Sequence, residues 1–102
     1  MLIYLKITNA SNLFAVTVSG ASKEKPYGLL LITEDLLKTC YNINNISNMF
    51  YYCAALAGAV PPFPSASYPV LNVVSGYLSG VTKANITNAE SLEARLVPAE
   101  WL

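Results

Sequence analysis

The chain has 102 residues, of which 54% are hydrophobic and only 12% are charged, about half the usual charged share. Its six basic and six acidic residues cancel, which disfavours general binding of DNA or RNA because no broad cationic face is available. The length predicts a single domain over residues 1–102. A chain this apolar usually hides surface in a membrane or in an interface with another copy of itself.

The first third of the chain predicts strands followed by a short helix. Strand-like runs occupy residues 2–7, 14–18 and 27–32, and the charged loop 20–26 separates the last two. Thr33 then has the character of a helix N-cap, because acidic residues follow it in the first turn and Lys38 lies in the last turn. We expect this helix to end near Cys40.

The middle of the chain carries no charged residue from position 39 to position 82. Ser47 or Asn45 caps an expected second helix, in which apolar residues recur at helical spacing as far as Val60. Its apolar stretch, Met49–Val60, is 12 residues long, whereas a membrane-spanning helix needs roughly 20. The sequence therefore predicts a buried helix and no membrane segment.

The last third predicts a helix, a strand, a helix and a strand. After the proline-rich loop 61–67, a helical pattern covers residues 69–80, although Gly76 weakens it and leaves a strand open as the alternative. Residues 81–86 favour a strand, residues 87–95 a capped short helix, and residues 96–102 an edge strand. No internal repeat is visible. The expected fold is an α/β (α+β) domain, in which a mixed sheet of about five strands has helices packed mainly on one face.

Candidate functional residues are few, and the chain contains no histidine, which removes the commonest general base and a common metal ligand. We expect no metal and no cofactor. Cys40 and Cys53 are either two buried thiols or a disulfide pair. Polar side chains near residues 10 and 45, together with one aromatic residue, make up the candidate ligand-binding set: Asn9, Ser11, Asn44, Asn45, Ser47 and Tyr77. The alternative is that the asparagines form turns and caps, and that the aromatic residues belong to a core or an interface.

Four stretches of the chain resemble the small viral type III anti-CRISPR ring nucleases and their relatives from crenarchaeal viruses. They are Ile7–Ala10, the strand-to-helix segment LITEDL at 31–36, the segment 47–61 that ends in LAGAVP, and the C-terminal part of the chain at residues 73–80 and 87–101. Members of that family have a five-stranded mixed sheet with helices on one side, and they bind and cut cyclic tetra-adenylate as symmetric dimers. The resemblance implies a homodimer located in the host cytoplasm.

The resemblance stops at the family's catalytic residues. The position of the family's histidine falls on Asn44 or Asn45, that of its arginine on Tyr77 and that of its glutamate on Ser79. An amide side chain cannot exchange a proton near neutral pH, so we expect no enzymatic activity. The sequence instead favours a small, soluble viral accessory protein that acts through self-association and through a host or viral protein partner. The alternatives are a protein that binds a cyclic oligoadenylate without cleaving it and, with less support, an active ring nuclease.

Overall fold

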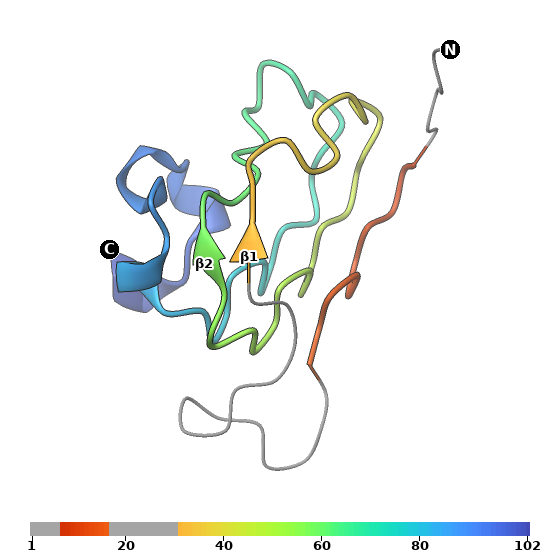
Figure 1. Ribbon diagram of the computed structural model, residues 1–102. Helices are drawn as coiled ribbons and strands as arrows, with labels where there is room; N and C mark the ends of the chain where they lie inside the picture. The colour runs from red at the N-terminus through yellow and green to blue at the C-terminus, as the bar shows by residue number, and fades with distance from the viewer. Residues whose placement is uncertain (1–6, 17–30) are drawn as a thin grey trace.

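The computed structural model describes residues 7–16 and 31–102. Regular secondary structure within these ranges is short, and most of the described chain consists of turns and extended links (Figure 1). Strand β1 (Leu31–Ile32) pairs in parallel with strand β2 (Ala57–Gly58). Four single-turn 3-10 helices follow: η1 (Lys83–Asn85), η2 (Ala89–Ser91), η3 (Ala94–Leu96) and η4 (Ala99–Trp101).

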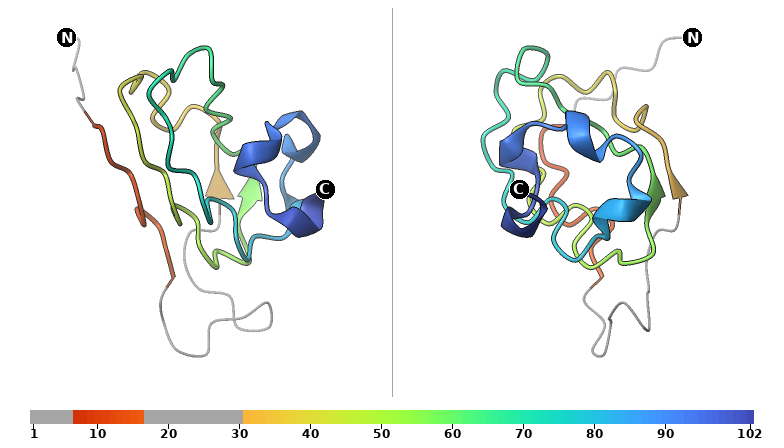
Figure 2. Two further views of the ribbon diagram at one scale, coloured as in Figure 1. Left: turned by 180° about the vertical axis from the view of Figure 1, so that it is seen from behind. Right: turned by 90° about the vertical axis from the view of Figure 1, so that its left-hand side faces the viewer.

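The described chain winds into three coils that stack in parallel. Asn9 of the first coil pairs with Asn45 of the second, and Asn45 pairs in turn with Val73 of the third. At another side of the coils, β1 lies beside β2, and Gly58 of β2 pairs with Ile86. The three segments therefore run side by side, in the order red, yellow-green and blue-green in the left view of Figure 2. This architecture is a short solenoid.

A constant offset of 28 residues relates the second coil to the third. The Asn88 side chain bridges the coils, because its Oδ1 accepts from the Val60 N–H at 3.0 Å and its Nδ2 donates to the Val60 carbonyl at 2.8 Å, 28 positions away. Ser65 donates its N–H to the Glu93 carboxylate at the same offset. The first coil is longer, since 22 positions separate Asn9 from Leu31 but only 12 separate their partners Asn45 and Ala57.

One side of the solenoid, hereafter the stacked wall, consists of residues 9–16, 45–53 and 73–81, and its amides alternate between two kinds of partner. One set donates within a coil to the carbonyl three residues back, as the Tyr51 N–H does to Asn48 at 3.2 Å. The amides between them donate to the next coil, as the Asn48 N–H does to Ser75 at 3.0 Å. Over residues 10–16 and 46–52, the amides that leave a coil all donate toward the third coil, whereas at the start of the wall the Val73 N–H donates back to the Asn44 carbonyl at 3.1 Å.

Apolar side chains of the stacked wall point inward, and side chains at equivalent positions of adjacent coils stack on each other. Phe14 and Phe50 occupy equivalent positions, and their rings stack at 5.5 Å with an interplanar angle of 10°. In the second coil Ile46, Met49, Phe50 and Cys53 are completely buried. Because these side chains face inward, the core runs along the axis of the coils. Burial of side chains of this size stabilises a fold by about 1.5–3 kcal/mol each.

Residues with a left-handed backbone shape the turns of the stacked wall. Asn12, Asn48 and Gly76 occupy equivalent positions in the three coils, with φ of 59°, 55° and 74°. Four residues later, Tyr52 and Gly80 repeat this conformation with φ of 57° and 83°. Asparagine and glycine adopt it at the lowest cost, and a right-handed helix cannot contain it. The chain therefore turns where a helix would continue.

The prediction of an α/β fold with about five strands and covering helices is wrong. Within the described ranges there are only two short strands and no α-helix, and the predicted helices at 47–60 and 69–80 are largely parts of the stacked wall. The inward residues of the second coil lie at 46, 49, 50 and 53, which is the spacing of an amphipathic helix. Hydrophobic periodicity alone could not distinguish the two conformations.

Other expectations from the sequence are also corrected. An internal repeat exists in the backbone, because the 28-residue offset holds along the second and third coils. The segment 33–40 forms turns, and residues 81–102 contain 3-10 helices where strands at 81–86 and 96–102 were expected. The predicted loop at 20–26 lies outside the described residues, and so does the predicted strand at 2–7 except for Ile7. Parts of the predicted strands at 14–18 and 27–32 also lie outside them.

Replacing Gly80 with alanine should destabilise the protein. The added Cβ would lie 2.9 Å from the Cα of Tyr52 in the neighbouring coil, at a residue with φ of +83°. We expect the free energy of unfolding, measured with urea, to fall by roughly 2–3 kcal/mol. The neighbouring Ser79→Ala variant is the control and should change it by less than about 0.5 kcal/mol. Equal stability of Gly80→Ala and the wild type would contradict the stacked-coil arrangement.

Candidate functional site

Four of the candidate residues lie together in the stacked wall, where they form turns. Asn9 and Asn45 occupy equivalent positions in adjacent coils, and so do Ser11 and Ser47. The Asn9 Oδ1 accepts from the Ser11 N–H at 2.9 Å, and the Asn45 Oδ1 accepts from the Ser47 N–H at 2.9 Å and the Ser47 hydroxyl at 2.8 Å. Both asparagine oxygens thus hold local turns, as asparagines often do.

The other two candidates do not join them in a polar site. Asn44 works through its backbone, donating its N–H to Thr8 at 2.7 Å and accepting from the next coil. Tyr77 is 1% exposed, and its hydroxyl donates to the Pro61 carbonyl at 2.7 Å. Burial raises the pKa of Tyr77 well above its usual range. Its ring is enclosed by the core and is inaccessible to a nucleobase.

The two cysteines are buried thiols, and no disulfide joins them. The Cys53 thiol donates to the Phe14 carbonyl at 3.2 Å. The structure thus places both cysteine side chains in the core without a bond between them.

The two ends of the stacked wall present opposite rows of unpaired backbone groups. In the first coil, no described residue donates a hydrogen bond to the carbonyls of the acceptor edge, which are those of Asn9, Ser11, Leu13 and Ala15. In the third coil, the donor edge consists of the N–H groups of Val74, Gly76, Leu78 and Gly80. None of these N–H groups has an acceptor among the described residues. Equivalent groups in the middle coil are all used for stacking. Each edge therefore offers the groups that the other lacks.

Apolar side chains are uncovered at the acceptor end. Leu13 is 48% exposed, whereas the equivalent Met49 and Tyr77 of the following coils are 0% and 1% exposed. Leu31 of β1 is 73% exposed. Phe14, Leu31, Ile32 and Leu36 are among the residues that line an open hollow of about 510 Å³ at this end. Within the described residues, no further coil covers the core here.

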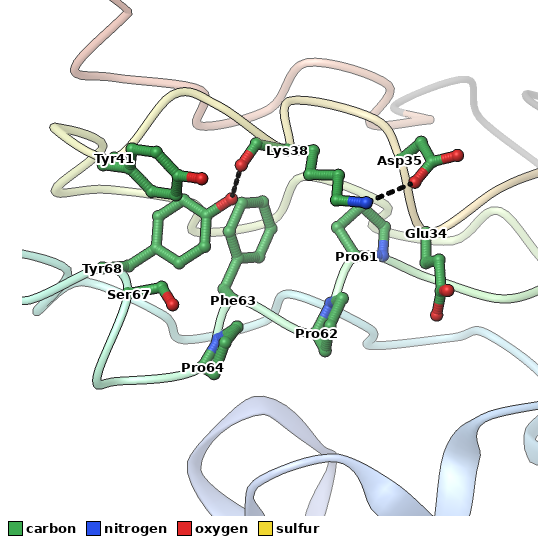
Figure 3. A pocket seen from close by; sticks show the side chains of 10 residues that line it. All are labelled: Glu34, Asp35, Lys38, Tyr41, Pro61, Pro62, Phe63, Pro64, Ser67 and Tyr68. Atoms are coloured by element: carbon green, nitrogen blue, oxygen red, sulfur yellow. Dashed lines mark hydrogen bonds and ion pairs between the residues drawn. The ribbon is translucent and has the colours of Figure 1, made fainter.

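A separate pocket of about 250 Å³ lies between the first and second coils, where segment 34–41 faces segment 61–68. Figure 3 shows Tyr41, Phe63 and Tyr68 gathered at one end, the carboxylates of Glu34 and Asp35 at the other, and Pro61 and Pro62 between them. Phe63 and Tyr68 meet edge to face at 5.0 Å. The pocket therefore has an aromatic end and an acidic end.

The aromatic end is rigid and the acidic end carries a net negative charge. The Tyr68 hydroxyl donates to the Lys38 carbonyl at 2.8 Å, and burial, followed by the neighbouring Tyr41 and Cys40, raises the pKa of Tyr68. Lys38 pairs with Asp35 at 3.4 Å, with both side chains 70% exposed. Glu34 has no ion-pair partner among the described residues. The pocket therefore favours a cationic group over an anionic one.

Two kinds of feature are absent from the described residues. These residues contain no group of three or more histidine, cysteine, aspartate or glutamate side chains placed to hold a metal ion. They also contain no helix long and apolar enough to cross a membrane.

Comparison with known proteins found no matching family model, no similar curated protein and no similar solved structure. The resemblance to the viral ring nucleases therefore gains no support from known proteins, and the fold that it implied is corrected above. Sequence reasoning missed the two edges because backbone groups have no residue-type signal. It missed the pocket because the lining segments lie far apart in the sequence.

The Tyr77 hydroxyl should contribute to stability. In the Tyr77→Phe variant, the buried Pro61 carbonyl loses its 2.7 Å hydrogen bond, so we expect the free energy of unfolding to fall by roughly 1–2 kcal/mol. Tyr52 is the matched control, because its side chain is 42% exposed and its hydroxyl has no partner among the described residues. The free energies of unfolding of Tyr77→Phe and Tyr52→Phe are compared by chemical denaturation. Equal losses of stability in the two variants would mean that Tyr77 is not buried as described.

Proposed function

We propose that this is a non-enzymatic accessory protein that acts by associating with further copies of itself, end to end. The donor edge of one molecule would pair with the acceptor edge of the next. The observation that carries the proposal is that the two ends of one stacked wall offer complementary rows of backbone groups that have no hydrogen-bond partner among the described residues.

The pairing proposed between molecules already operates within each molecule. The amides of Ile46, Asn48, Phe50 and Tyr52 donate to the third coil at 2.8–3.1 Å. The donor edge holds the equivalent amides of the third coil, and a second copy would supply the missing carbonyls. Each such hydrogen bond contributes about 1 kcal/mol net, and an unpaired edge is a template for another chain.

The acceptor edge lacks the features that usually prevent association, whereas at the donor edge residues 95–98 of the C-terminal segment lie across a small hollow from residues 74–79. Proteins protect exposed edges with charged residues and prolines, yet segments 9–16 and 73–80 contain neither. Solenoids normally carry a capping repeat with a polar outer face, whereas Leu13 and Leu31 are exposed at the acceptor end. Contact between ends would cover these side chains and would explain why a chain with so few charges leaves them uncovered.

The ends differ from each other, so their contact is heterologous. Such a contact generates an open stack or a ring, and it does not produce a two-fold symmetric dimer. The proposal therefore replaces the homodimer expected from the sequence with a concentration-dependent series of oligomers.

Binding of a cyclic oligoadenylate has less support. The oxygens of Asn9 and Asn45 hold turns, and the stretch 39–82, which contains most of the candidate residues, has no cationic side chain. Phosphate groups are usually recognised by arginine or lysine.

Sedimentation over a wide range of concentration tests the proposal. The average mass of the wild type should rise with concentration and continue beyond the dimer. Leu13→Glu places a charge at the acceptor end and should shift the protein to the monomer. The control is Val70→Glu, because Val70 is 50% exposed on the second coil and belongs to neither edge.

Three results would count against end-to-end association. A wild type that stays monomeric at a protein concentration of about 100 μM, roughly 100 times the Kd of a micromolar complex, would overturn it. A closed dimer would contradict the heterologous contact. Equal effects of Leu13→Glu and Val70→Glu would show that another surface is responsible.

A further inference from the structure

We propose that the pocket between segments 34–41 and 61–68 binds an arginine side chain presented by a protein partner. This site lies between the first and second coils, away from the edges of the stacked wall. The inference therefore goes beyond the proposed self-association and does not depend on it.

The aromatic end of the pocket suits the flat face of a guanidinium group. Tyr41 is 51% exposed, and its ring lies 5.5 Å from that of Tyr68 at an angle of 51°. Tyr68 is only 6% exposed and its hydroxyl donates to the Lys38 carbonyl at 2.8 Å, so it holds Tyr41 in place from beneath and Tyr41 offers the accessible ring face. Arginine stacks on aromatic faces through cation–π attraction, and an immobile platform reduces the entropy lost on binding.

The acidic end supplies the charge that a cation needs. Glu34 has no ion-pair partner among the described residues, and the Lys38–Asp35 pair is highly exposed, with its two charged atoms 3.4 Å apart. Exposed pairs of this kind contribute little to stability, so Asp35 can accept a competing guanidinium. Since one lysine faces two carboxylates, the rim repels phosphate groups, which argues against a nucleotide as the occupant.

The size of the pocket matches one side chain. Its volume of about 250 Å³ is below the roughly 300–1,000 Å³ of sites that enclose whole small molecules. Pro61 and Pro62 form an apolar floor between the two ends, and Pro64 lies at the aromatic end (Figure 3). The methylene stem of an arginine can lie on such a floor while its charged head stays at the rim.

The test uses the full chain and two short peptides that differ at one residue. One peptide carries a single arginine between prolines, and in the other a citrulline replaces it, which keeps the shape but removes the charge. Binding is measured by isothermal titration calorimetry at low salt. We expect the arginine peptide to bind and the citrulline peptide to bind at least tenfold more weakly, as the loss of a charge-assisted hydrogen bond implies.

Two substitutions in the pocket should act in opposite directions. Glu34→Gln removes an acceptor charge and should weaken binding of the arginine peptide by roughly tenfold. Lys38→Met removes the competing cation and should strengthen binding severalfold. Glu100→Gln is the matched control, because it removes an exposed carboxylate in η4, outside the pocket, and should leave binding unchanged.

Three outcomes of the binding experiment would contradict the proposed arginine site. Equal binding of the two peptides, no binding of either, or equal weakening by Glu34→Gln and Glu100→Gln would overturn the proposal. All variants are also measured by sedimentation. Unchanged self-association in Glu34→Gln would show that the pocket and the edges act separately, and loss of self-association in that variant would overturn their independence.

Discussion

The alternating direction of amide hydrogen bonds in the stacked wall is the constraint on which the rest of the structure depends. One set of amides closes turns within a coil, and the other set crosses to the next coil at 2.8–3.1 Å. The crossing bonds fix the register at 28 residues between the second and third coils, where Asn45 pairs with Val73, and the pairing of Asn9 with Asn45 in the first and second coils brings Phe14 onto Phe50. Because the crossing amides of residues 10–16 and 46–52 all point the same way, this part of the wall is polar along the axis of the solenoid. Its two ends cannot be alike, and this polarity is the physical basis of the proposed self-association.

The composition of the chain follows from this architecture. In a solenoid each coil covers the core of its neighbour, so the middle coil is buried on both sides and needs few charged residues. The charge-free stretch 39–82 contains that whole coil. At the acceptor end no coil follows among the described residues, and inward side chains such as Leu13 become exposed there. The same low charge that suits the interior of a stack leaves its ends open to a further copy.

The sequence predicted which residues are buried better than it predicted their backbone. Met49, Cys53 and Val60 of the predicted buried helix are 0% exposed, but Val70 and Val73 of the next predicted helix are 50% and 41% exposed. Tyr77, a ligand-binding candidate, lies in the core, and Asn9 and Asn45 form turns, as the alternative interpretation held. The backbone could not be inferred, because side chains at i, i+3, i+4 and i+7 face one side in an α-helix and also in this wall. The left-handed conformation of Tyr52 is one that tyrosine seldom adopts, so no propensity rule would predict it. The repeat is equally hidden, since Asn45 and Val73 are equivalent but share no chemistry.

Amide hydrogen exchange along the third coil, read residue by residue in a dilute sample by NMR, tests the stacked wall most directly. The account predicts alternation from residue 76 to residue 81, in which Tyr77, Ser79 and Val81 exchange slowly because they donate within their turns. The intervening amides of Gly76, Leu78 and Gly80 should exchange quickly, whereas the amides of residues 46–53 in the middle coil should all be protected, because each has an acceptor. Continuous protection over residues 74–81 in the monomer would indicate a helix or a covered edge, and it would contradict both the fold described and the self-association proposed from it.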